Sequence, residues 1–231
     1  MRDILLAGGI LLAFALSGVG LVSWTFQGTV DRIEQNQREA LLQELQQLVP
    51  PDRYDNALTD DTLDVEDNGL LGMHGTVTAY RARMDDEPVA VILPAKARDG
   101  YTGPITLLVG IYADGRIAGV RVVDHSETPG LGDAIEPRRS NWINQFVGQS
   151  LDDPDTAEWA VKRDRGAFDQ LTGATVTARA VVRAVRDALL FYDQFGEELF
   201  ASDTAPDEEP QDANEDPDGD ESSEGEDDSN E

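Results

Sequence analysis

The apolar run at the amino terminus constrains the fold most, because in lipid it leaves the backbone of that segment one stable conformation. No charged residue occurs from Ile4 to Val30, and the run from Ile4 to Phe26 is 23 mostly apolar residues long. Only a helix of this length satisfies its own backbone hydrogen bonds while it crosses a bilayer. The run therefore predicts a membrane anchor helix over residues 1–30. A cleaved signal peptide is the competing interpretation, although the run exceeds a typical signal core and no small-residue cleavage site closes it.

Residues 31–50 lead from this anchor toward the rest of the chain. Apolar residues recur there at helical spacing, which predicts an amphipathic connecting helix that ends at Pro50 and Pro51. The apolar positions are Ile33, Leu41, Leu42, Leu45 and Leu48. We expect this helix to pack against the domain that follows.

Residues 51–200 carry the pattern of one α+β domain. After a polar connection that ends near Asn68, alternating and β-branched segments predict strands, and two later segments predict helices. The expected strands are 76–83, 88–94, 104–112 and 116–124, and the expected helices are 138–147 and 178–195. Strands followed by helices favour one antiparallel sheet flanked by helices.

The charge is concentrated at the carboxyl terminus. The formal net charge is −28, and residues 202–231 hold fifteen Asp or Glu and no Lys or Arg, which leaves −13 for the rest. Almost no apolar residue occurs in this segment, so it predicts a disordered acidic tail over residues 201–231. So acidic a chain excludes a nucleic-acid partner. Cysteine is absent, which excludes disulfides and thiolate-bound clusters, so redox work would need a bound cofactor.

The segment from Asp169 to Thr177 places a threonine hydroxyl beside two small residues at the expected start of a helix, near Thr177. The first N–H groups of a helix lack intrahelical partners and its dipole favours negative charge. Thr175 therefore lies where a phosphoester would be stabilised, and Gly173 and Ala174 leave room for another molecule. The alternative is that these are ordinary turn and capping residues, with Thr177 as the N-cap.

Three segments resemble those of FMN-binding domains, and they occur in the order of that family. Asp-x-x-Thr-Gly-Ala-Thr, from Asp169 to Thr175, resembles the signal at which a flavin transferase takes FMN from FAD and esterifies its phosphate to the last threonine. Residues 125–132, His-Ser-Glu-Thr-Pro-Gly-Leu-Gly, and 100–105, Gly-Tyr-Thr-Gly-Pro-Ile, resemble two further loops. The resemblance implies covalent FMN on Thr175 and implies that the transferase reads Asp169.

Over about residues 1–195, the anchor, Tyr54-Asp55-Asn56 and these loops together resemble the G subunits of Rnf-type ion-translocating electron transport complexes. The related C subunits of sodium-translocating NADH:quinone reductases remain the nearest alternative. The resemblance implies a single-pass inner-membrane protein with a periplasmic domain that assembles with other membrane subunits into a redox-driven translocase. It also implies electron transfer between ferredoxin and NAD coupled to ion movement and, in some bacteria, reduction of a redox-sensing transcription factor.

The candidate cofactor-binding residues lie in two of these segments. They are Thr172, Gly173, Ala174, Thr175, Thr177, His125, Glu127, Thr128 and Gly130. His125 is expected to shape the cofactor pocket, because a metal site would need more ligands than Glu127 or Asp133 could add. For Glu127, a hydrogen bond to flavin and a purely structural role are both open. Tyr101 and Trp142 are candidates either for stacking on the ring or for burial at the sheet edge.

No Ser-His-Asp group or pair of catalytic carboxylates indicates independent catalysis, and no metal site is expected. Two interpretations of other classes stay open. One is a sensor that binds flavin noncovalently, and the other is an envelope interaction protein without a cofactor.

Overall fold

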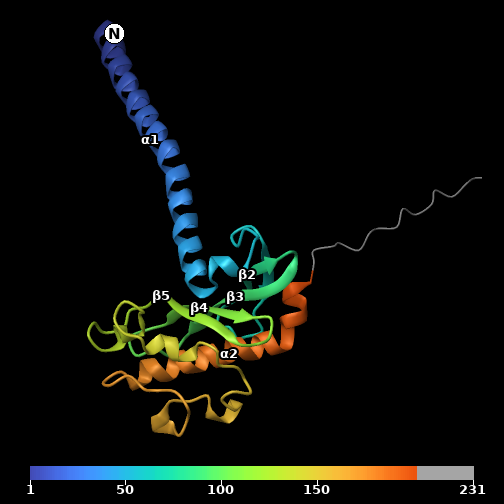
Figure 1. Cartoon of the computed structure of the whole chain (residues 1–231). Helices are drawn as coiled ribbons and strands as arrows, with labels where there is room; N and C mark the ends of the chain where they lie inside the picture. The colour runs from blue at the N-terminus through green and yellow to red at the C-terminus, as the bar shows by residue number, and fades with distance from the viewer. Residues whose placement is uncertain (202–231) are drawn as a thin grey trace, which may run out of the picture. The chain divides into compact units, whose positions relative to one another are not determined.

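The amino-terminal part of the architecture is one long helix. A computed structural model of the chain describes residues 1–201, so the predicted acidic tail lies, apart from Ala201, outside the described residues. Helix α1 (Arg2–Leu48) joins the predicted anchor and connecting helices without a break, as no proline interrupts it before Pro50 (Figure 1). Its segment Ile4–Ser23 has a mean hydropathy of 2.3 over 20 residues and is apolar enough to cross a membrane.

The centre of the domain is an antiparallel sheet in which every strand pairs with its sequence neighbours, in the order β1-β2-β3-β4-β5. The strands are β1 (Thr62–Glu66), β2 (Thr76–Met84), β3 (Glu87–Ala97), β4 (Ile105–Tyr112) and β5 (Ile117–Asp124). The predicted α+β class, with one antiparallel sheet, is confirmed. Strand β1 is not among the predicted strands and lies in the segment predicted to be a polar connection. It lacks a strong strand pattern, because only Leu63 and Val65 in it are apolar. Strand β3 continues three residues past its predicted end at Pro94.

Helices cover both faces of the sheet. Helix α2 (Thr175–Phe200) packs along one face over the larger core, and the last turns of α1 pack on the other face (Figure 1). Residues Ala90 to Leu93 of β3 are all fully buried, since covered faces on both sides of a strand select a continuous apolar run. The predicted packing of residues 31–50 on the domain is thus seen for their last two turns.

The predicted helix over residues 138–147 is wrong. This segment instead forms turns and a short 3-10 helix, η3 (Trp142–Phe146). The hydroxyl of Ser140 donates to the carbonyl of Ala134 at 2.6 Å and accepts from the backbone N–H of Trp142 at 3.1 Å. Such local side-chain bonds give the backbone an alternative to a helix. The other short helices are η1 (Pro51–Arg53), η2 (Gly132–Ile135), η4 (Thr156–Glu158) and η5 (Lys162–Asp164).

The end of α1 packs against a pair of glycines on the sheet. Gly110 and Gly119 are opposite each other on β4 and β5, and a Cβ added to either would come 3.3 or 3.2 Å from the side chain of Leu48. Because neither glycine has a side chain, the sheet surface has room there for the side chain of Leu48, which is 1% exposed. This contact fixes the membrane helix to the sheet.

Replacing Leu48 by alanine is expected to lower the free energy of unfolding by about 2–5 kcal/mol, because it leaves a cavity over the two glycines. Thermal unfolding of the detergent-solubilised full chain measures the loss. Ile33→Ala is the matched control, as Ile33 is 49% exposed on the same helix and its truncation should cost less than about 0.5 kcal/mol. Equal effects of the two substitutions would contradict this account of the docking.

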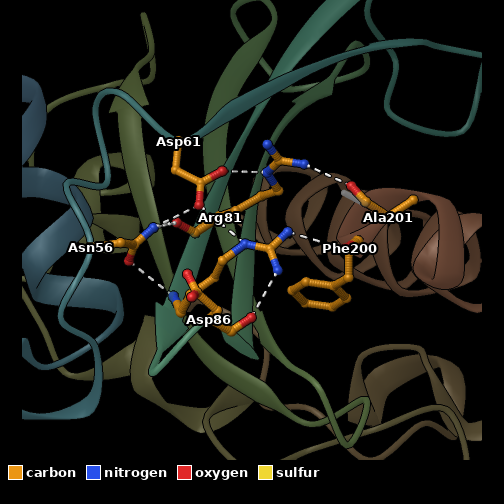
Figure 2. Close-up of polar contacts among 7 residues, drawn as sticks. Asn56, Asp61, Arg81, Asp86, Phe200 and Ala201 are labelled. Atoms are coloured by element: carbon orange, nitrogen blue, oxygen red, sulfur yellow. Dashed lines mark hydrogen bonds and ion pairs between the residues drawn. The ribbon is translucent and has the colours of Figure 1, made fainter. Parts of the chain in front are cut away.

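A partly buried charged network, called here the Asp61 network, holds the far end of α2 (Figure 2). The carboxylate of Asp61 accepts from Arg81 Nε at 2.5 Å and from Arg83 Nε at 3.1 Å. The two guanidinium groups also donate to the carbonyls of Ala201 and Phe200 at 3.0 and 3.1 Å. Cations at these last carbonyls satisfy the helix end and complement its dipole. They help to explain why α2 extends five residues beyond its predicted end at Phe195.

The segment that follows α1 joins the same network through an amide. Asn56 Nδ2 donates to Asp61 Oδ2 and to the carbonyl of Arg81, both at 2.9 Å, and Asn56 Oδ1 accepts from the backbone N–H of Arg83. Asn56 thereby ties the chain leaving the membrane helix to strand β2.

Candidate functional site

Thr175 is the first residue of α2, so the helix begins two residues before the predicted start at Thr177. The N-cap is Ala174, which is 8% exposed and provides no side-chain hydrogen bond. The side chain of Thr175 is partly exposed, and within residues 1–201 no hydrogen bond engages its hydroxyl. The hydroxyl is therefore both accessible and free to react.

The backbone around this hydroxyl is also unpaired. In the described part of the chain, the N–H groups of Thr175, Val176 and Thr177 make no hydrogen bond, and the first helical bond runs from Ala178 to Ala174 at 3.1 Å. Three free N–H groups at the positive end of a 26-residue helix favour an anion. Because the N-cap has no polar side chain, nothing competes with that anion, so the residues present fit a phosphate group.

The three motif segments, the third together with the first turn of α2 that follows it, meet at the carboxylate of Glu127, a residue that is 4% exposed. Its Oε2 accepts from the hydroxyl of Thr177 at 2.5 Å, and its Oε1 accepts from the backbone N–H of Thr102 at 3.1 Å. A Cβ on Gly132 would lie 2.7 Å from Oε2, and one on Gly100 would lie 2.8 Å from Oε1. Both glycines are needed for this close approach. We call this convergence the Glu127 junction.

His125 supports the same loop from the side. Its Nδ1 accepts from the backbone N–H of Glu127 at 3.0 Å, and its Nε2 lies 2.9 Å from Glu136 Oε1. An accepting Nδ1 assigns the ring proton to Nε2 in the neutral imidazole, which then donates to Glu136. His125 therefore orients the loop that carries Glu127.

The remaining predicted residues line the turns beside Thr175. The carbonyl of Thr128 accepts from the N–H groups of Leu131 and Gly132 at 3.2 and 3.0 Å, and Gly130 has a φ of +78°. Gly173 has a φ of +83°, and a Cβ there would come 3.0 Å from Leu131 Cδ2. Left-handed backbone favours glycine at both turns. These contacts place the tip of the second motif segment directly beside the third.

Thr172 and Asp169 precede the helix and are both exposed. The carbonyl of Asp169 accepts from Trp142 Nε1 at 2.7 Å, and its carboxylate pairs with Lys162 Nζ at 2.6 Å. The indole of Trp142 is thus used to hold the motif backbone, and it packs edge-on to Phe146. Tyr101, by contrast, is 70% exposed.

Exposed apolar side chains gather on the motif segments. In the described residues after α1, the large apolar side chains that remain exposed are Tyr101, Val123, Leu131, Val147 and Val176. Tyr101 and Leu131 belong to two of the three motif segments that meet at the Glu127 junction, and Val176 directly follows the third. Exposed apolar surface beside an anion site suits a ligand with a flat ring and a phosphate.

The surroundings of the helix start are charged in pairs. Arg179 Nε and Asp164 Oδ2 are 2.5 Å apart, and this hydrogen bond lowers the pKa of Asp164 and raises the pKa of Arg179. The pair therefore stays charged at neutral pH.

Within the described residues, no group of three or more His, Cys, Asp or Glu lies close enough together to hold a metal ion.

Some residues of the site were absent from the sequence-based candidates. Thr102, Gly132 and Leu131 lie in the recognised segments, yet nothing in the local sequence indicates that their partners are Glu127 and Gly173. The contact of Trp142 with the carbonyl of Asp169 joins residues 27 apart in the chain and has no sequence signal.

Comparison with known proteins identifies two family segments in this chain. The family model of the FMN-binding domain matches residues 100–190, and that of the RnfG N-terminal region matches residues 1–48. The first range contains the Glu127 junction and the start of α2. The second contains helix α1, including the turn at Leu48 that packs on the sheet.

Relatives of the whole chain are proteins named as the G subunit of an ion-translocating oxidoreductase complex. One from Pseudomonas aeruginosa is 51% identical over 205 residues, covering 88% of this chain and 96% of the relative. One from Shewanella baltica is 44% identical over 202 residues, covering 87% and 95%, and one from Vibrio cholerae is 44% identical over 192 residues, covering 83% and 91%. The chain belongs to the family of G subunits of ion-translocating oxidoreductase complexes.

Proposed function

We propose that this protein is a membrane-bound electron-transfer subunit whose FMN is esterified through its phosphate to the hydroxyl of Thr175. The observation that carries the proposal is the start of α2, where a free, partly exposed hydroxyl stands among three unpaired backbone N–H groups. Membership of a family with an FMN-binding domain supplies the cofactor. When bound, FMN takes up and releases electrons, and the protein supplies attachment, orientation and polarity.

The attachment step uses the hydroxyl of Thr175 as the nucleophile. Its Oγ1 forms a bond to the FMN phosphorus of FAD, the pyrophosphate bond of FAD breaks, AMP leaves, and the hydroxyl proton goes to a base of a flavin transferase. The N–H groups of Thr175 to Thr177 would hold the phosphate oxygens, because they have no other partner in the described chain. Leu131 and Val176 offer apolar surface to the ring, and Gly130 and Gly173 keep its approach open.

Family membership supports the wider role. The relatives are subunits of ion-translocating oxidoreductase complexes, so the partners proposed here are the other membrane subunits of such a complex. We further propose that the complex exchanges electrons between ferredoxin and NAD, that it lies in the inner membrane, and that the flavin domain faces the periplasm. The 20-residue apolar segment of α1 supports a single membrane crossing.

The proposal is tested by producing the full chain with and without a flavin transferase. Intact mass should rise by FMN minus one water only when the transferase is present, and the denatured band should fluoresce in a gel. A chain that stays unmodified beside an active transferase would overturn the covalent proposal. Flavin that copurifies but is lost on denaturation would instead support noncovalent binding.

A further inference from the structure

We infer that Glu127 is a positioning residue for flavin attachment, which acts through the hydroxyl of Thr177 and does not touch the flavin. The inference rests on the proposed modification of Thr175. Its starting point is that Glu127, a residue that is 4% exposed, directs both carboxylate oxygens into the protein, one to Thr177 and one to Thr102. Neither oxygen is left to face a cofactor.

Helix geometry explains how a bond at Thr177 controls Thr175. Successive residues of an α-helix are about 100° apart around the axis, so side chains two residues apart point to nearly opposite sides. Thr177 is fully buried, whereas Val176 is 43% exposed and Thr175 is partly exposed. Holding Thr177 inside therefore fixes the rotation of the first turn at which the Thr175 hydroxyl faces outward.

The first turn of α2 is held by the apolar packing of Ala174 and Ala178, which are 8% and 0% exposed, and by one polar side-chain contact. Its N-cap Ala174 provides no side-chain hydrogen bond. Within residues 1–201, the bond from Thr177 to Glu127 is the only side-chain hydrogen bond that residues 174–178 make. Helix ends without a cap fray easily. The three unpaired N–H groups would then no longer point at one phosphate position.

Glu127 is itself held firmly enough to act as a fixed point. The hydroxyl of Thr102 donates to the carbonyl of Ser126 at 2.5 Å, and the backbone N–H of Glu127 donates to His125 Nδ1 at 3.0 Å. Gly100 and Gly132 pack against the carboxylate, where a Cβ would come within 2.8 Å. The carboxylate thus cannot turn outward without a change in two loops.

The test measures the initial rate of flavin attachment by a transferase on the full chain, with FAD as donor and mass as readout. Thr177→Val keeps the shape of the side chain but removes the hydroxyl. It should slow attachment by about ten- to a hundredfold, the range that corresponds to a lost hydrogen bond to a charged group. Thr177→Ser restores the hydroxyl and should restore most of the rate. Thermal unfolding of each variant is recorded in parallel.

Glu127→Gln provides a second variant of similar volume. It should slow attachment less than Thr177→Val does, because an amide can still contact the hydroxyl. The double variant should be no slower than Thr177→Val alone, since residues that act as a unit have non-additive effects. Thr78→Val is the matched control, as the Thr78 hydroxyl donates to Asp64 Oδ1 at 2.8 Å at the opposite edge of the sheet, and its rate should equal wild type.

The outcomes separate this inference from the proposed function. An unmodified wild-type chain beside an active transferase would overturn attachment at Thr175 and the inference with it. A modified wild type together with an unchanged rate for Thr177→Val would overturn the role of Glu127 alone. A slower rate that follows only the unfolded fraction, with no rescue by Thr177→Ser, would also overturn it.

Discussion

Replacing Thr175 by alanine is expected to abolish covalent flavin attachment while the domain stays folded. The substitution removes the Oγ1 atom that forms the ester. It should change the free energy of unfolding by less than about 0.5 kcal/mol, because the hydroxyl has no hydrogen bond in the described structure and alanine is a good helix former. The full loss of modification with unchanged stability separates a chemical role from a structural one.

Intact mass and in-gel fluorescence of the denatured chain measure the result, with the transferase and FAD in excess. Thr175→Ser keeps a hydroxyl at the helix start and should retain part of the modification. Thr156→Ala is a control at an exposed threonine whose hydroxyl, among residues 1–201, bonds only to the carbonyl of Leu151, and its flavin content should equal wild type. Full modification of the Thr175→Ala chain would place the ester at another residue.

Replacing Asp61 by alanine is expected to lower the free energy of unfolding by about 3–5 kcal/mol, because it leaves two largely buried guanidinium groups without their carboxylate. The side chains of Arg81 and Arg83 are 7% and 12% exposed, so water replaces the lost partner poorly. The same carboxylate accepts from Asn56, so one substitution loosens β2, the segment after α1 and the end of α2 together.

Thermal or urea unfolding of the detergent-solubilised chain measures this loss. Asp64→Ala is the matched control, since Asp64 is exposed on the neighbouring edge strand and bonds to the hydroxyl of Thr78, and it should cost less than about 0.5 kcal/mol. A loss below about 1 kcal/mol for Asp61→Ala would mean that water or other acceptors compensate Arg81 and Arg83 once the carboxylate is removed.

Elements with a strong local signal could be predicted from the sequence, and elements held by distant partners could not. The apolar run and the strands β2 to β5 carry their own periodicity, which is set by burial along each element. Strand β1 has two apolar residues and is defined by its pairing with β2. The segment at 138–147 has helical spacing, yet it forms turns and a 3-10 helix, and Ser140 bonds back to Ala134.

The candidate site, too, could be predicted only where the signal is local in the sequence. The motif around Thr175 indicates the helix start to within two residues, because glycine, alanine and threonine before an apolar helix form a local pattern. The alternative role of Thr177 as an N-cap is wrong, since its hydroxyl is engaged by a carboxylate 50 residues earlier in the chain. A single sequence contains no signal for that pairing, and Glu127 could not be assigned its partners before the fold was known.

The Glu127 junction forms only when the chain folds. Its bonds join residues 25 and 50 positions apart, so an unfolded chain contains the threonine motif without the surface that displays it. If a transferase reads that surface, modification follows folding and cannot precede it. The ratio of flavin to polypeptide in a preparation would then measure the fraction of molecules that folded and were modified. A mutation far from Thr175 that slows folding would first be detected as a lower flavin content.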